Sequence, residues 1–262
     1  MQSSHYGGII PADRDEQHRT RLFWSLVVLA QVLGLVICIL VGFWTAWYPP
    51  VHQRHNAKVP YDKNTHFPRY PSFAYHPLFM TLAMVFLLGQ GTLIHRIIRP
   101  YANSRVRASI HLVIMALVFC MAVSGVHAVF QVNTVHMANA HTWIGMLALI
   151  SIAAQCLFGF LAFYFPGSSP NVHRFYKPQH RFFGITIFVL SGTAALMGVS
   201  IVGLEREIVA DIGDARIMST ALILSIAAYV ITVVGILVHP DFERGSEQDE
   251  AESLIGRGRV IS

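Results

Sequence analysis

Long apolar runs separated by short polar segments dominate the chain. Six of these runs exceed the roughly 20 residues that an α-helix needs to cross a bilayer core about 30 Å thick. They cover residues 22–47, 75–98, 108–131, 141–165, 181–203 and 217–239. The pattern therefore predicts an all-α membrane protein with six transmembrane helices, and it leaves little chain for a soluble domain.

The composition points to the same class. Of the 262 residues, 54% are hydrophobic and 13% are charged, which is outside the usual balance of soluble domains. All three cysteines lie inside apolar runs, so neither a disulfide framework nor a thiolate metal site is expected. We expect an N-terminal tail over residues 1–21, one six-helix domain over 22–240 and a disordered acidic tail over 241–262.

The loops suggest an orientation in the membrane. Two of the segments between runs are basic and contain no acidic residue, and by the positive-inside rule they face the cytoplasm. Their basic residues are Arg96, Arg99, Arg105 and Arg107 in the first segment, and Arg174, Lys177 and Arg181 in the second. With six spans, both termini are then cytoplasmic as well. The loop over residues 48–72 is also basic, which opposes this assignment.

One histidine lies near the start of each of four consecutive runs, at His76, His111, His141 and His180. Consecutive runs cross in opposite directions and rise 1.5 Å per residue. His76 and His141 are therefore expected near the non-cytoplasmic face, and His111 and His180 near the cytoplasmic face. Intramembrane histidines are unfavourable unless they have a partner, so two pairs matched in depth indicate a functional site.

Several kinds of site are compatible with these pairs. An interhelical hydrogen bond explains a single histidine, and zinc requires further ligands that the runs hardly provide. Haem iron requires only two axial ligands, and two histidines per iron leave no open position, which favours electron transfer over oxygen binding. The alternative from another class is a haem-free, histidine-lined metal or proton transporter.

Four short motifs carry a resemblance to a known family. They are residues 73–80 (FAYHPLFM), 141–145 (HTWIG), 165–167 (FPG) and 178–184 (PQHRFFG). Over roughly residues 22–245 the chain resembles the cytochrome b561 family of ascorbate-dependent transmembrane electron carriers. It is most similar to the chromaffin-granule, duodenal and lysosomal branches. The resemblance implies that helices two to five form a four-helix bundle around two haem b groups per chain, with the ligand pairs given above.

The resemblance also implies an activity. Ascorbate would be the cytoplasmic electron donor, and monodehydroascorbate or ferric iron the acceptor, as in a transmembrane ascorbate ferrireductase or monodehydroascorbate reductase. A homodimer is implied, and no nucleic-acid partner is expected. An acidic dileucine pattern at residues 250–255 (EAESLI) favours an endosomal or lysosomal membrane, with a secretory vesicle or the plasma membrane as alternatives.

The donor site is expected at the basic end of the bundle, because ascorbate is an anion at neutral pH. The family places lysines three and seven residues before the third-helix histidine, and an arginine seven before the fifth-helix histidine; here Ala108, Ser104 and His173 stand there. The residues predicted to bind ascorbate or haem propionates are Arg96, Arg105, Arg107, His173, Arg174, Tyr176 and Lys177. Topogenic charge alone explains the basic residues equally well.

The acceptor site is predicted at the opposite end. Its candidate residues are Phe130, Asn133, His136, Glu205 and Arg206. His52, His55 and His66, in the long loop after the first run, are candidates for guiding a metal ion to that site. Ordinary solvated loop histidines are the alternative interpretation.

Overall fold

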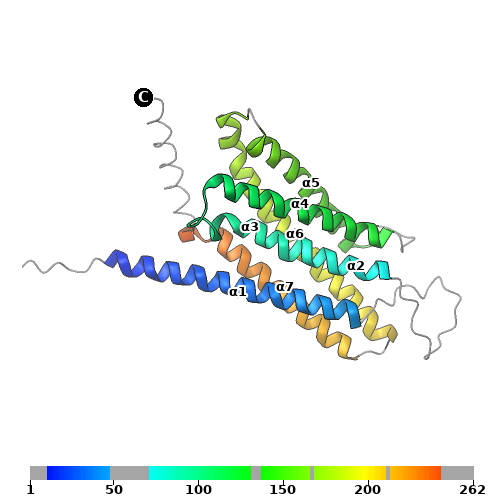
Figure 1. The fold of residues 1–262 in the computed structure, drawn as a ribbon. Helices are drawn as coiled ribbons and strands as arrows, with labels where there is room; N and C mark the ends of the chain where they lie inside the picture. Colours follow the sequence, from blue (N-terminus) through cyan, green and yellow to red (C-terminus); the bar gives the residue numbers. More distant parts are fainter. Residues whose placement is uncertain (1–10, 48–70, 131–136, 166–167, 211–212, 243–262) are drawn as a thin grey trace, which may run out of the picture.

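The computed structural model describes residues 11–47, 71–130, 137–165, 168–210 and 213–242. Over these residues the fold is entirely helical, and no strand is present among them (Figure 1). The elements are α1 (Pro11–Trp47), α2 (Pro71–Met80), the π-helix η1 (Thr81–Leu87), α3 (Leu88–Ile97), α4 (Ser104–Phe130), α5 (Ala140–Gly159), the π-helix η2 (Phe160–Tyr164), α6 (Pro170–Ala210), α7 (Gly213–Val238) and the 3₁₀ turn η3 (Pro240–Phe242).

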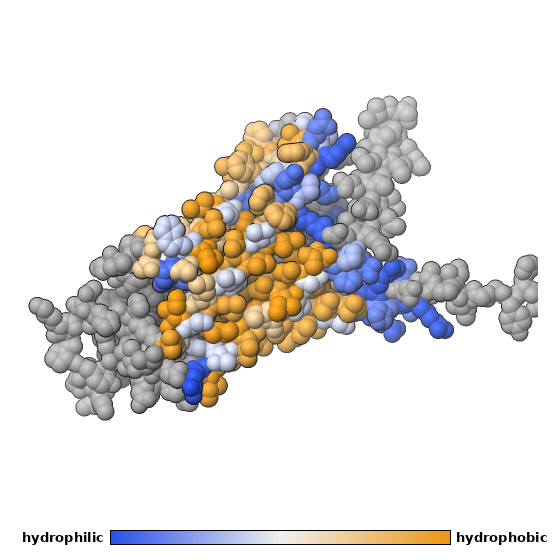
Figure 2. Space-filling model, turned by 180° about the vertical axis from the view of Figure 1, so that it is seen from behind, coloured by the Kyte–Doolittle hydropathy of each residue, from blue (hydrophilic) through white to orange (hydrophobic). Residues whose placement is uncertain are grey.

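Six helical stretches are long and apolar enough to cross a membrane. They are Glu16–Ala46, Tyr75–Ile97, Ser104–Phe130, Ala140–Tyr164, Pro170–Leu204 and Arg216–Val238. Figure 2 shows a broad apolar belt across the middle of the molecule, with hydrophilic residues gathered at one end. The predicted fold class is confirmed, and the protein is an integral, multi-pass membrane protein.

Two helices begin earlier than the apolar pattern predicts. The helix α6 begins at Pro170 rather than at residue 181, so Arg174 and Lys177 lie on the helix instead of in a loop, and Pro178 lies inside it. Pro170 is a favourable first residue, because the fixed φ of proline is already helical and the N–H that it lacks would have no partner in the first turn. The helix α1 begins at Pro11, within the predicted N-terminal tail. Residues 1–10 and 243–262 of the predicted tails lie outside the described residues.

The six spans pack as a bundle with two helices along one side. The second span, formed by α2, η1 and α3, packs on α4, and α5 packs on α6. These four spans carry the four histidines. Outside them, α1 and α7 lie side by side, and α7 also packs on α6 (Figure 1). The indole Nε1 of Trp44 donates a hydrogen bond to Ser219 Oγ at 2.9 Å and joins α1 to α7.

The second span is interrupted by the π-helix η1, which lies between His76 and the end of the span at Ile97. There the amide of Leu88 reaches the carbonyl of Ala83, five residues earlier. Such π-bulges insert one residue into an α-helix and are frequent at functional sites. The register of the second span therefore changes between its two ends.

Candidate functional site

The bundle brings the four histidines together in two pairs. The ring centroids of His76 on α2 and His141 on α5 lie 6.1 Å apart, with an interplanar angle of 88°. Those of His111 on α4 and His180 on α6 lie 6.2 Å apart, at 76°. These are the same pairs that helix direction and depth predict. Their role as ligands stays a prediction.

Three of the four imidazoles are anchored to the backbone of another helix. The Nδ1 atoms of His76, His111 and His141 lie 2.8–2.9 Å from backbone carbonyl oxygens. The three oxygens belong to Gly125, Gly91 and Ala194, respectively. A carbonyl oxygen only accepts hydrogen bonds, so each Nδ1 carries the proton, and Nε2 keeps its lone pair. Imidazoles that bind metals are commonly held in this tautomer by such a bond.

Glycines make room for two of the rings. A Cβ added to Gly198 would lie 2.8 Å from Cε1 of His141, and one added to Gly159 would lie 2.9 Å from Cε1 of His180. Real Cβ contacts are not that close, so each ring lies directly against a helix backbone. Sequence reasoning missed Gly159. Its signal is its spacing, because it follows His141 by eighteen residues, as Gly198 follows His180, and eighteen residues complete five helical turns.

His180 is held differently from the other three histidines. Its Nδ1 is buried and has no hydrogen-bond partner among the described residues. The ring is surrounded by aromatic side chains instead, with centroids 5.2 Å away at Phe163 and 5.7 Å away at Tyr176. Packing and Gly159, rather than a backbone hydrogen bond, therefore orient this imidazole.

The spacing of the pairs fits a shared metal ion with two axial ligands. A metal–imidazole bond is about 2 Å long, so two imidazoles on opposite sides of one ion have centroids roughly 6 Å apart. In the described part of the chain, no group of three or more His, Cys, Asp or Glu side chains is placed to hold a metal ion. A zinc site with three or four protein ligands is therefore not formed there, whereas haem iron requires only the two histidines.

Arg96, one of the predicted anion-binding residues, contacts the end of another helix. Its guanidinium donates to the carbonyl oxygens of Ile236 at 2.6 Å and Leu237 at 2.7 Å. Arg181 donates to the Leu237 oxygen as well, at 2.9 Å. The last carbonyls of a helix lack partners within the helix, and cationic side chains satisfy them well. Arg96 thus caps the C-terminus of α7.

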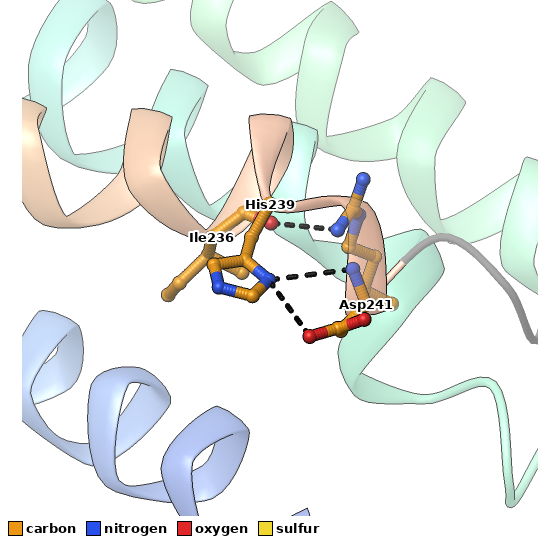
Figure 3. Close-up of polar contacts among 4 residues, drawn as sticks. Ile236, His239 and Asp241 are labelled. Carbon is orange, nitrogen blue, oxygen red and sulfur yellow. Dashed lines mark hydrogen bonds and ion pairs between the residues drawn. The ribbon is translucent and has the colours of Figure 1, made fainter. Parts of the chain in front are cut away.

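The turn after α7 completes this cap. The backbone amide of Asp241 donates to Nδ1 of His239 at 3.3 Å, and the Asp241 carboxylate lies 4.0 Å from the same nitrogen (Figure 3). The His239 ring stacks on Phe242 at 4.4 Å, and Phe242 meets Phe23 of α1 at 5.3 Å. The basic end of the bundle is thereby tied to both outer helices.

Arg105, one of the predicted anion-binding residues, lines a cavity. The cavity has a volume of about 470 Å³ and lies between the start of α4 and η2. Its lining includes Ala108, at one replaced lysine position, and Phe163, which contacts His180. Arg107 is engaged elsewhere, because its Nη1 donates to the carbonyl of Ala102 at 2.8 Å in the turn between α3 and α4.

The other residues of the predicted donor site lie on α6. The His173 ring meets Phe163 edge-on at 4.7 Å, and the Tyr176 hydroxyl donates to Gln155 Oε1 at 3.5 Å. Arg174 and Lys177 are exposed. The structure therefore gathers His173 and Tyr176 around Phe163, near the pair of His111 and His180. It leaves Arg96 and Arg107 on backbone carbonyls.

Sequence reasoning missed a fifth histidine beside the pair of His111 and His180. The ring centroid of His95 on α3 lies 5.1 Å from that of His111. His95 directly precedes Arg96 at the polar end of its span, so it resembled an ordinary boundary residue. Its helix position relative to His111 was the missing information.

The predicted acceptor site falls mostly outside what the structure describes. Phe130 is exposed at the end of α4. Glu205 and Arg206 lie on α6, but their side chains are outside the described part. The remaining residues, Asn133, His136, His52, His55 and His66, also lie outside the described residues. Their roles stay predictions.

The four-histidine region is similar to a known family. The family model for eukaryotic cytochrome b561 matches residues 75–204, which include all four histidines. The transmembrane ascorbate-dependent reductase CYB561 of Mus musculus is 28% identical over 235 residues, and that of Ovis aries 29%; each match covers 86% of both chains. The transmembrane ascorbate ferrireductase 2 of Arabidopsis thaliana is 26% identical over 218 residues, which cover 81% of this chain and 88% of the relative.

Proposed function

The chain belongs to the cytochrome b561 family, and from that premise we propose that it carries single electrons across a membrane from cytoplasmic ascorbate to an acceptor on the other side. The observation that carries the proposal is that four imidazoles from four different spans form two pairs. The two ring centroids within each pair lie about 6 Å apart. His111 and His180 are the proposed ligands of an inner haem b, and His76 and His141 those of an outer one.

Each part of the chain has a defined task in this proposal. Haem b, when bound, supplies an iron that alternates between the ferric and ferrous states. The carbonyls of Gly125, Gly91 and Ala194 keep three ligand imidazoles in the tautomer that leaves Nε2 free. The surrounding apolar helices exclude water, so that electrons cross without an accompanying leak of ions.

The proposed donor is ascorbate, because the mouse and sheep relatives are named for their dependence on it. The cavity beside Arg105 is separated from the inner pair by Phe163, which lines the cavity and contacts His180. Its one cationic side chain, Arg105, would raise the local concentration of an anion. Arg174 and Lys177 add positive charge on the neighbouring helix, whereas the contacts of Arg96 favour a structural role.

The proposed acceptor is ferric iron or monodehydroascorbate. The name of the Arabidopsis thaliana relative includes ferrireductase activity, and this supports ferric iron. Phe130, Asn133, His136, Glu205 and Arg206 are the proposed residues of the acceptor site, and a homodimer in an endosomal or lysosomal membrane is the proposed setting.

The test is the visible absorption spectrum of the detergent-purified protein, recorded oxidised and again after ascorbate is added. The expected result is a low-spin b-type spectrum, two haems per chain by haem extraction, and rapid reduction. Two haems that ascorbate leaves oxidised would overturn the donor assignment. A colourless protein would overturn the proposal and favour a histidine-lined transporter.

A further inference from the structure

A chain of hydrogen-bonded polar side chains joins the outer helices α1 and α7 to the second span of the histidine bundle. Gln31 on α1 donates from Nε2 to Gln90 Oε1 at 3.1 Å, and Gln90 Nε2 donates to the hydroxyl of Tyr229 on α7 at 3.2 Å. The Tyr229 hydroxyl in turn donates to the carbonyl oxygen of Phe86 at 3.0 Å. Tyr229 is fully buried. None of these three side chains belongs to the histidine pairs.

The chain ends on the π-helix of the second span. Phe86 belongs to η1, and Gln90 directly precedes Gly91, whose carbonyl accepts the Nδ1 hydrogen bond of His111. The space around the hydroxyl is closely limited. A Cβ added to Gly89 would collide with the Tyr229 hydroxyl oxygen. The backbone of the second span therefore packs directly against the Tyr229 hydroxyl, two residues before Gly91.

The spacing along the spans explains why the register matters. Three spans carry a histidine of one pair and a carbonyl that accepts from a histidine of the other pair. On α4 these are His111 and Gly125, and on α6 they are His180 and Ala194, each fourteen residues apart. On the second span they are fifteen residues apart.

One extra residue rotates an α-helix by about 100°. On α4 and α6, the accepting carbonyl has the same angle around the helix axis relative to the histidine of that span. In an uninterrupted α-helix, the Gly91 carbonyl would be rotated by about 100° from that angle, relative to His76. The π-helix between His76 and Gly91 inserts one residue and absorbs this difference. It thereby allows both groups to face the bundle.

We propose that Tyr229 is a positioning residue that holds this π-helix in register through Phe86 and Gln90, and so sets the hydrogen bond from His111 to Gly91. The inference rests on the proposed function, because its readout is the haem that His111 would bind. A hydrogen bond from Nδ1 makes an imidazole a more basic ligand, which stabilises ferric over ferrous iron. Loosening the bond is expected to raise the reduction potential of the inner haem.

The test is Tyr229→Phe in the full-length protein, which removes the hydroxyl and keeps the ring. Redox titration is expected to show a more positive midpoint potential for one haem, and electron paramagnetic resonance an altered signal for the same haem, with both haems retained. Ser225→Ala is the matched control, because this hydroxyl on the same helix bonds only to the carbonyl of Ala221, one turn away, in the described contacts. Potentials and signals equal to those of the control would overturn the proposal.

A second variant guards against a folding defect. Gly89→Ala keeps the tyrosine but displaces its hydroxyl, and the same haem is expected to shift in the same direction. Loss of both haems from both variants would contradict the proposal, because a disturbed His111 bond accounts for the loss of one haem at most. A wild-type protein without haem would refute the proposed function, whereas a normal wild type with unshifted variants would refute only this inference.

Discussion

The two histidine pairs have almost the same separation but are held in different ways. In the outer pair, His76 and His141 both donate from Nδ1 to backbone carbonyls. In the inner pair, only His111 does so, and Nδ1 of His180 has no partner among the described residues. One site is thus oriented by the backbone on both sides, and the other on one side only.

The surroundings of the inner pair also leave its His180 ring less constrained. The His180 ring lies among Phe163 and Tyr176, and Phe163 lines the cavity that Arg105 faces. A ring held by packing can adjust its tilt more readily than one held by a hydrogen bond. The comparison indicates a rigid outer site and a more adaptable inner site that adjoins the cavity of the proposed donor.

The largest expected effect comes from removing one inner ligand. His180→Ala or His111→Ala is expected to lower the haem content from two per chain to one, because the outer pair uses different helices for both ligands. Haem extraction with a protein assay measures the ratio, and the remaining haem is expected to keep its wild-type spectrum. Equal loss of both haems would contradict the pairing.

The two ring-contacting glycines offer a direct test of rigidity. Gly198→Ala is expected to be more harmful than Gly159→Ala, because the His141 ring is tied to Ala194 and has less freedom to move aside than His180. Overpacking of this kind costs typically 1–3 kcal/mol, so Gly198→Ala is expected near the upper end of that range. Thermal loss of the Soret band measures the difference. A more harmful Gly159→Ala would refute the assignment of a rigid outer site.

A smaller effect is expected at the cavity. Arg105→Ala is expected to raise the KM for ascorbate about tenfold, since a hydrogen bond to a charged group contributes roughly 1.5–3 kcal/mol. Haem content and the spectrum should stay unchanged. Stopped-flow reduction measures the effect, and Arg21→Ala, an exposed arginine on α1, controls for the lost charge. Equal KM values in the two variants would show that the cavity does not bind the donor.

The smallest effect on the donor is expected from Arg96. Arg96→Met removes two hydrogen bonds to the end of α7, so we expect a loss of thermal stability of about 1–3 kcal/mol and a nearly unchanged KM for ascorbate. Thermal unfolding and stopped-flow reduction of one preparation measure both quantities. A large rise in KM without loss of stability would restore Arg96 to the donor site.

Most of the fold was predictable because its determinants are local. The length and polarity of each run determine whether it spans a bilayer, and all six runs are confirmed as helices of sufficient length. The start of α6 was not predictable in the same way. Residues 170–180 are too polar to belong to the apolar run, and a helix that continues beyond the apolar layer has no hydropathy signal.

The sequence by itself determined the six spans, the histidine on each of four of them and which histidines pair. Alternating helix direction and a constant rise per residue are sufficient for that. Only the tertiary structure decided which neighbours each side chain meets. The carbonyl of Ala194, the backbone at Gly159 and the end of α7 are brought to His141, His180 and Arg96 by helix rotation and packing. These contacts join residues far apart in the chain, and no local pattern specifies them.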